Sequence, residues 1–322
     1  MLQSRILVML AWAAFFSAGH VQGWPQWRHH WLPGSRHSAS PLPDHSSLAA
    51  NMRPRVEVLQ PRPSNRPLDI VLTHYNHANL PQVMDYWRLV LDSIPLKAYI
   101  FIYCKGHSTL EDFGWMQHQG ELHILPNVGR ESHSYLWHIT HHIDDLADHT
   151  LFNQAMPDMD NSSMIARLRQ FSASTGMLGL AMVVDCGCSD CYLGDIPFIK
   201  EIWAMSQSDF CSPELRYAAF MKGAFLVSRQ RLLDVPNKVY KSLLQVLSAP
   251  DDHWAHRQHG YDGLKNENNP LMGHIMERSW NILFDCIDLK AAQQCWACDE
   301  GKECLSMACQ CRDDMSAISQ LN

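Results

Sequence analysis

The segment between Pro126 and Asp160 holds the side chains best suited to bind an anion. It opens with the loop Asn127-Val128-Gly129-Arg130-Glu131, in which a glycine, an arginine and a glutamate are consecutive. Glycine permits a close backbone approach, and the free N–H groups at a helix start attract phosphate. An arginine binds phosphate oxygens bidentately. The loop therefore predicts an anion site at Gly129 and Arg130. The alternative is a surface ion pair between Arg130 and Glu131 that caps a helix.

Other reactive side chains suggest metal or nucleophile chemistry less clearly. His138, His141 and His142 have helical spacing and are candidate zinc ligands. No glutamate falls between them as in His-Glu-x-x-His, so a solvated helical face is favoured. The chain has no Gly-x-Ser-x-Gly elbow, no Gly-x-Gly-x-x-Gly fingerprint and no Walker-type loop. This weighs against a serine hydrolase, a dinucleotide enzyme or a P-loop enzyme.

Apolar runs and helical periods indicate the elements that position these groups. Strands are expected at 69–73, 98–103, 122–125, 150–152 and 220–228, and 178–184 is a further apolar run. Helices are expected at 82–91, 135–143, 229–247 (interrupted at Pro236) and 274–284. The alternation of strands and helices predicts an α/β fold with a mostly parallel, doubly wound sheet. A polar link is expected at 162–175.

In such a fold, ligands bind beyond the carboxyl ends of the strands. Three predicted strand ends then converge: 74–77, 105–106 and 127–131. Lys105 and Arg130 are the expected phosphate contacts, because of their charge and position. The amides expected to bind polar groups of the ligand are Asn76, Asn127 and Gln154.

Composition and the chain ends indicate a secreted protein. Arg5 and the apolar run 6–16 predict a signal peptide at 1–23; the alternative is an uncleaved membrane anchor, for which the run is short. Residues 24–67 are expected to form a disordered extension, 68–285 the α/β domain and 286–322 a Cys-rich tail. The net charge of −7 argues against a nucleic-acid partner. Asn161-Ser162-Ser163 is a glycosylation sequon.

The 11 cysteines support the same compartment. Most fall in two groups, 186–211 and 295–311, which behind an export signal predict disulfides. Zinc is the alternative, since Cys295 and Cys298 have ligand spacing. An odd count leaves one thiol unpaired, and Cys104, at the end of an apolar strand, is the expected free cysteine.

Six motifs carry a resemblance to a family of fungi and algae that is known as a domain of unknown function. They are His74-Tyr75-Asn76, Tyr103-x-Lys105-Gly106, Leu125-Pro126-Asn127-Val128-Gly129-Arg130-Glu131-Ser132-His133-x-Tyr135, Asp148-x-Thr150-x-Phe152-x-Gln154, Lys222-Gly223-Ala224-Phe225-x-Val227-Ser228, and Asn269-Pro270-x-x-Gly273-His274-x-x-Glu277-Arg278-x-Trp280-x-x-x-Phe284. The layout of that family resembles nucleotide-sugar glycosyltransferases of the A-type fold. The resemblance covers residues 68–284. One departure is Gln154-Ala155-Met156-Pro157, where the family has Gln-Gly-His-Pro, so a role for that glycine and histidine is not carried over.

The resemblance implies sugar transfer from a nucleotide-sugar donor to a glycan acceptor. Asp158 and Asp160, after the fourth strand, match the Asp-x-Asp pair that binds Mn²⁺ or Mg²⁺ in metal-dependent members; the alternative is a solvated loop. The matched helix makes His274 and Glu277 the candidate general bases. Here the alternative is a buried ion pair between Glu277 and Arg278.

Two functions are therefore expected. One is a glycosyltransferase-like enzyme of the secretory lumen or the extracellular space. The other is a secreted carbohydrate-binding or interaction protein that has the same fold but no catalysis, which the altered Gln154-Ala155-Met156-Pro157 segment favours.

Overall fold

The computed structural model describes residues 55–58, 62–75, 80–94, 96–107, 112–113, 120–156, 161–191, 194–207, 210–250, 253, 267–289, 295 and 309–313. Its centre is an eight-stranded sheet with the order β1-β4-β3-β2-β5-β11-β6-β12. The strands are β1 (Arg55–Val58), β2 (Leu68–His74), β3 (Ala98–Cys104), β4 (Gly120–Ile124), β5 (His149–Gln154), β6 (Thr175–Gly179), β11 (Phe225–Ser228) and β12 (Gln310–Arg312).

The four neighbouring strands β4, β3, β2 and β5 are parallel. The pairs β1–β4, β11–β5, β11–β6 and β12–β6 are antiparallel. The expectation of an α/β fold is confirmed, and the parallel part is the centre of a mixed sheet. Every residue of β2 is buried, as the continuous apolar run predicts for a strand covered on both faces.

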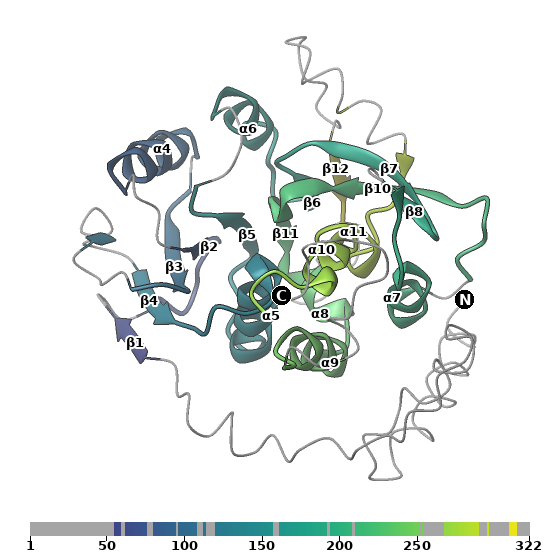
Figure 1. Ribbon diagram of the computed structural model, residues 1–322. Helices are drawn as coiled ribbons and strands as arrows, with labels where there is room; N and C mark the ends of the chain where they lie inside the picture. The colour runs from purple at the N-terminus through teal and green to yellow at the C-terminus, as the bar shows by residue number, and fades with distance from the viewer. Residues whose placement is uncertain are drawn as a thin grey trace. The chain divides into compact units, whose positions relative to one another are not determined.

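Helices cover both faces of this sheet (Figure 1). On one face, α4 (Leu80–Ser93) and α6 (Asn161–Leu168) meet where the Tyr86 hydroxyl donates to Met164 Sδ, and Asn153 of β5 reaches the same sulfur. On the other, Tyr135 of α5 (Arg130–His142) packs against Phe152, with ring centroids 4.9 Å apart. Because Phe152 and Asn153 are consecutive in a strand, they point to opposite faces.

The strand order defines where a ligand crevice is expected. From β2, the order runs through β3 to β4 in one direction, whereas β5 lies on the other side of β2. The carboxyl ends of β2 and β5 therefore flank a topological switch point, where open α/β sheets bind their ligands. The two ends are joined where the Ala155 N–H donates to the Thr73 carbonyl at 2.8 Å.

The C-terminal half of the domain differs from the expected pattern in three places. The single strand expected at 220–228 is β10 (Arg216–Phe220), a 3-10 turn (Met221–Gly223) and β11, because Lys222 and Gly223 have left-handed backbones. The run 178–184 divides between β6 and β7 (Val183–Gly187), and β7 pairs with β10 in a second sheet. The expected polar link at 162–175 contains α6.

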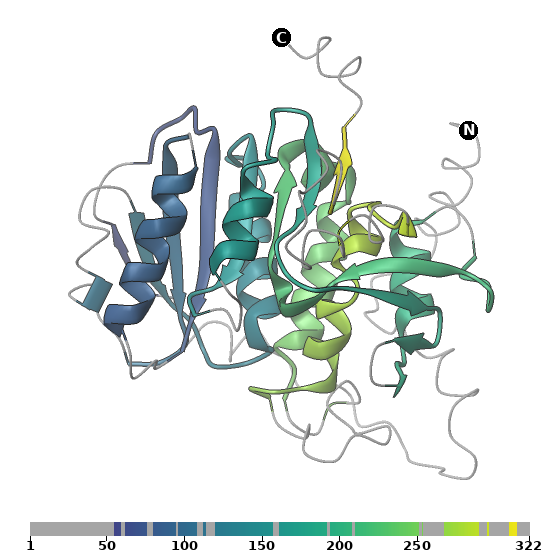
Figure 2. The same cartoon turned by 90° about the horizontal axis from the view of Figure 1, so that it is seen from above.

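The helices after β11 follow the sequence more closely. Pro236 separates α8 (Arg229–Asp234) from α9 (Asn237–Leu247), as expected. The helix expected at 274–284 begins earlier and has two parts, α10 (Leu271–Glu277) and α11 (Trp280–Leu283). The remaining elements are α7 (Ile199–Ser206) and a short hairpin of β8 (Asp190–Cys191) with β9 (Gly194–Asp195). Figure 2 shows α10 and α11 beside β10 and β11.

The described cysteines form disulfides, as expected. The pairs are Cys186–Cys191, Cys188–Cys211, Cys286–Cys311 and Cys295–Cys309. Cys104 is the free, buried cysteine of this part of the chain. Two disulfides hold the tail, whose strand β12 pairs with β6 at the sheet edge. Cys295 is thus half of a disulfide and not a zinc ligand.

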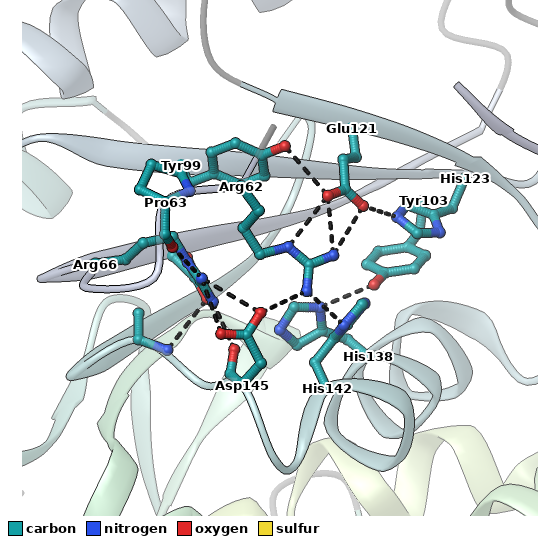
Figure 3. A network of polar contacts seen from close by, with 12 residues as sticks. Arg62, Pro63, Arg66, Tyr99, Tyr103, Glu121, His123, His138, His142 and Asp145 are labelled. Carbon is teal, nitrogen blue, oxygen red and sulfur yellow. Dashed lines mark hydrogen bonds and ion pairs between the residues drawn. The ribbon is translucent and has the colours of Figure 1, made fainter. Parts of the chain in front are cut away.

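Part of the extension expected to be disordered belongs to the fold. Residues 55–58 form β1, and the connector to β2 is held by two arginines (Figure 3). Arg62 binds both carboxylate oxygens of Glu121, and its Nη1 lies 2.9 Å from Asp145 Oδ2. Arg66 makes two bonds to the buried carboxylate of Asp69. Glu121 and Asp69 lie at the amino ends of β4 and β2. This network therefore fixes the amino ends of the strands, opposite the carboxyl ends where the ligand is expected.

The same network contains two of the three histidines that were candidate zinc ligands. His138 is fully buried, and its Nδ1 lies 2.8 Å from the Tyr103 hydroxyl. His142 Nδ1 lies 3.0 Å from Arg62 Nη1. His141 is exposed and stacks on Trp137. The expectation of a solvated face is therefore wrong for His138, and none of the described His, Cys, Asp or Glu side chains gather in threes as metal ligands would.

Candidate functional site

The loop between β4 and α5 has the unusual backbone that its sequence suggested. Gly129 has φ 62° and Arg130 has φ 54°, so two consecutive residues are left-handed. A Cβ on Gly129 would lie 2.9 Å from the Cβ atoms of His133 and Leu247. Only glycine fits this position. For Arg130 the same region costs about 1–2 kcal/mol, and strain of this kind concentrates at functional sites.

The guanidinium of Arg130 lies over the start of α10. Its Nη1 is 2.8 Å from His274 Nε2 and 3.4 Å from Asn269 Oδ1. Its Nε is 3.4 Å from Glu131 Oε2, and its Nη2 is 3.8 Å from Glu277 Oε2. Three of these four contacts are long for hydrogen bonds. The side chain retains 23% of its exposure, so solvent reaches the guanidinium, and His274 is its one close partner among these four contacts.

Gly273 gives Arg130 the space that it occupies. A Cβ at position 273 would lie 3.0 Å from Arg130 Cδ and 3.2 Å from its Cγ. The glycine of the Gly273-His274 motif therefore allows close contact between α10 and the aliphatic part of the arginine, which brings the imidazole of His274 within reach of the guanidinium.

Lys105 lies at the end of β3 and beneath this loop. Its ammonium donates to the carbonyls of Val128, at 2.5 Å, and of Arg130. The residue is buried, and burial lowers the pKa of Lys105 to about 7, although the charge of Glu131 opposes that shift. Lys105 contacts the backbone on both sides of Gly129; the expected phosphate contact would require a different arrangement of its side chain.

Two carboxylates lie beside Arg130. Glu131 and Glu277 are both about 5% exposed. Burial raises the pKa of Glu131; Arg130 opposes the shift and Glu277 adds to it. Glu131 Oε1 and the nearby Tyr135 hydroxyl are buried and have no hydrogen-bond partner among the described residues. This side of the cluster is therefore poorly solvated.

Glu277 also holds the left-handed turn before β11. Its Oε1 accepts the Lys222 N–H at 2.6 Å, and Gln154 Nε2 lies 3.4 Å from the Lys222 carbonyl. Gly223, with φ 58°, leaves room for Glu131, whose Cγ would be 3.0 Å from a Cβ there. The turn thus connects the end of β5 to the carboxylate cluster. Glu277 and Arg278 also form the buried ion pair that was the alternative to a catalytic role, with Arg278 Nη1 3.8 Å from Glu277 Oε2.

His274 is neutral near pH 7. Burial and the charges of Arg130 and Arg278 lower the pKa of His274 to about 4. Its Nε2 also lies 3.0 Å from Asn269 Oδ1. A neutral imidazole accepts a hydrogen bond from Arg130, but it is a weak general base.

The structure brings most of the expected site residues together. Contacts join Lys105, Arg130, His274 and Glu277 in one cluster, with Gln154 at its margin. Asn127 and Gly129 lie in the loop itself, and Asn127 is half-buried. Asn76, Asp158 and Asp160 lie outside the described residues, as do residues 1–54 with the expected signal peptide.

Sequence reasoning missed Glu131, Tyr135 and Asn269 as site residues. Glu131 was assigned a role only in the alternative, a surface ion pair with Arg130; the pair forms, but Glu131 is buried. One feature of the sequence could have identified Glu131 as a site residue: it lies in the first turn of a helix, next to an arginine. Tyr135 lies one helical turn further on, on the same face of α5, so the helical period links these two. Asn269 begins the motif that contains His274.

No described helix has the length and the apolar composition needed to cross a bilayer. A comparison with curated proteins finds no match. A family match extends over residues 100–307, from within β3 to the Cys-rich tail, and includes the loop 127–131 and the whole of α10. Since this range is well over half of the chain, the protein belongs to the family described as "Protein of unknown function (DUF3431)".

Proposed function

We propose that this protein binds a nucleotide-sugar through Arg130 and transfers the sugar to a hydroxyl group of a glycan acceptor. The observation that carries the proposal is the partly exposed guanidinium of Arg130, which lies beyond the carboxyl ends of parallel strands. Its contacts to Glu131, Asn269 and Glu277 are 3.4–3.8 Å long, so a diphosphate would replace weak partners with charge-assisted, bidentate ones.

Glu277 is the better of the two general-base candidates. The imidazole of His274 already accepts a hydrogen bond from Arg130, which occupies the lone pair that would take a proton from a hydroxyl group. Glu277 is a carboxylate beside Arg130 and is fixed by the Lys222 N–H. In the proposal, Glu277 accepts the proton of the acceptor's hydroxyl group, while His274 holds the guanidinium that faces the donor.

Asp158 and Asp160 are the proposed ligands of a divalent cation. Both follow β5, one of the two strands at the switch point, and their carboxylates suit Mn²⁺ or Mg²⁺. Such a cation would neutralise the diphosphate of the donor. Isothermal titration of UDP with and without Mn²⁺ tests this assignment. If these residues are the ligands, the double variant Asp158→Asn, Asp160→Asn loses any Mn²⁺ dependence of its UDP affinity.

The decisive experiment compares Arg130→Gln with Arg216→Gln. Arg216 is a matched control, since it also pairs with two carboxylates, Asp185 and Asp190, but lies in the second sheet. Titration with UDP-sugars and GDP-sugars is expected to show at least tenfold weaker binding for Arg130→Gln and no change for Arg216→Gln, provided that both melt as the wild type does. Equal affinity of all three proteins rejects the phosphate role of Arg130.

A second function is favoured by the contacts of Lys105. Its ammonium is bonded to two backbone carbonyls, so one of the two expected phosphate contacts is occupied. A carbohydrate-binding protein without catalysis needs neither the diphosphate contact nor a base. The disulfides of both cysteine groups support an oxidising compartment for either function. Hydrolysis of the nucleotide-sugar without added acceptor favours the transferase, whereas glycan binding without donor turnover favours the second function.

A further inference from the structure

The left-handed backbone at Gly129 and Arg130 needs an external support. Gly129 adopts φ 62° freely, but Arg130, at φ 54°, does not. Its conformation places the guanidinium toward Gly273 and His274 instead of along the surface of α5. Helix α5 supplies no side-chain cap, because the residue before its first turn is Gly129. Something outside the helix must therefore hold the turn.

Lys105 contacts the turn on both sides. Its Nζ donates to the carbonyl of Val128, which precedes Gly129, and to the carbonyl of Arg130, which follows it. Lys105 is itself fixed, since its backbone N–H donates to the His74 carbonyl of β2 at 2.9 Å. The ammonium thus connects the two central strands to the residue that carries the guanidinium.

We infer that Lys105 is a positioning residue, which holds Arg130 in its left-handed conformation and thereby directs the guanidinium toward its ligand. That the ligand is an anionic donor rests on the proposed function. The pair of bonds from Lys105 to the loop carbonyls, called the clamp below, does not depend on it. Lys105 then acts on an anionic donor through Arg130 and does not touch phosphate itself.

The clamp depends on pH because its donor titrates near neutrality. In the described part of the chain, the titratable groups that face the ammonium are Glu131 and His133, both of α5. Glu131 favours the charged form of Lys105, but burial lowers the Lys105 pKa to about 7. Above that pH the ammonium becomes an amine, and its bonds to the two carbonyls lose the added strength that the charge provides. The turn is therefore held most firmly below pH 7.

Hydrogen exchange of the peptide covering residues 126–133 tests the clamp without any ligand. In the wild type, protection corrected for the intrinsic exchange rate is expected to fall at least threefold between pH 6 and pH 8.5. Lys105→Met should lower protection at pH 6 at least tenfold and abolish its pH dependence. Lys97→Met is the matched control, because Lys97 is an exposed lysine at the other end of β3, and it should behave as the wild type.

UDP and GDP titrations then connect the clamp to binding. Wild-type affinity is expected to fall about tenfold over the same pH range, and Lys105→Met should bind weakly at every pH. Wild-type exchange that does not vary with pH, or a folded Lys105→Met variant with wild-type exchange, overturns the inference. If the wild type binds neither nucleotide, the proposed function fails, and the exchange data alone decide the role of Lys105.

Discussion

Gly273 and Arg130 are in contact because position 273 has no side chain: a Cβ there would lie 3.0 Å from Arg130 Cδ. This contact joins the α5 loop to α10, two segments that are more than 130 residues apart in the sequence. It also sets the position of the guanidinium relative to His274 and Glu277.

Gly273→Ala should therefore move the guanidinium and leave the fold intact. Alanine raises the helix propensity of α10 by up to about 1 kcal/mol, which offsets the crowding at Arg130. We expect a thermal midpoint near that of the wild type and about tenfold weaker binding of UDP or GDP, since a charge-assisted contact is worth about 1.5 kcal/mol or more. Wild-type affinity in a folded variant would mean that the position of Arg130 does not matter for binding.

Gly129→Ala should destabilise the protein by about 3 kcal/mol. The left-handed backbone costs alanine about 1 kcal/mol or more, and contact with His133 and Leu247 adds a similar or larger overpacking cost. Urea unfolding measures the loss. Gly187→Ala is the matched control, because its Cβ would meet only the ends of the Asp190 and Arg216 side chains, and its cost should stay below about 1 kcal/mol. Equal losses of unfolding free energy in Gly129→Ala and Gly187→Ala would contradict the backbone strain expected for alanine at position 129.

Glu121 should make the fold sensitive to acid. Burial alone would raise the pKa of Glu121, but hydrogen bonds from His123 and Arg62 and the charge of Arg62 lower it to about 2. Between pH 4.5 and pH 2 the unfolded chain binds this proton and the folded chain does not. The stabilisation is therefore complete above pH 4.5 and is lost as the pH falls toward 2, by about 3 kcal/mol in all.

Urea unfolding at several pH values checks this with Glu121→Gln, which cannot titrate. Glu121→Gln should be less stable at pH 6, where Arg62 loses one of its two charged partners, and its stability should fall less steeply than that of the wild type below pH 4.5. Parallel pH curves for the two proteins would show that Glu121 does not carry the acid sensitivity.

The disulfide between Cys286 and Cys311 should stabilise the tail strand. It closes a loop with a sequence separation of 25 residues, for which the loss of chain entropy in the unfolded state amounts to about 3 kcal/mol. Replacing both cysteines with serine should lower the free energy of unfolding by about that amount and increase exchange in β12, which pairs with β6. Cys104→Ala, at a free cysteine, is the control and should leave exchange in β12 unchanged.

The central part of the fold followed from the sequence because local patterns are strong there. The strands at 69–73 and 98–103 are buried on both faces, so they are apolar throughout and easily recognised. The interruption at Pro236 was also predictable, since proline lacks the N–H that a helix requires. The turn at Lys222 was not, because the left-handed backbone of a lysine depends on the Glu277 carboxylate, 55 residues away.

Strand positions and residue types by themselves determined that Arg130 lies at a strand end, that Cys104 is the free one among the described cysteines and that Lys105 lies near Arg130. Only the tertiary structure decided what each polar group touches. Lys105 binds backbone carbonyls, Glu131 is buried, and His138 belongs to a network at the opposite end of α5. The physical reason is that burial and hydrogen bonding depend on neighbours from distant segments, whereas periodicity and charge are properties of the local chain.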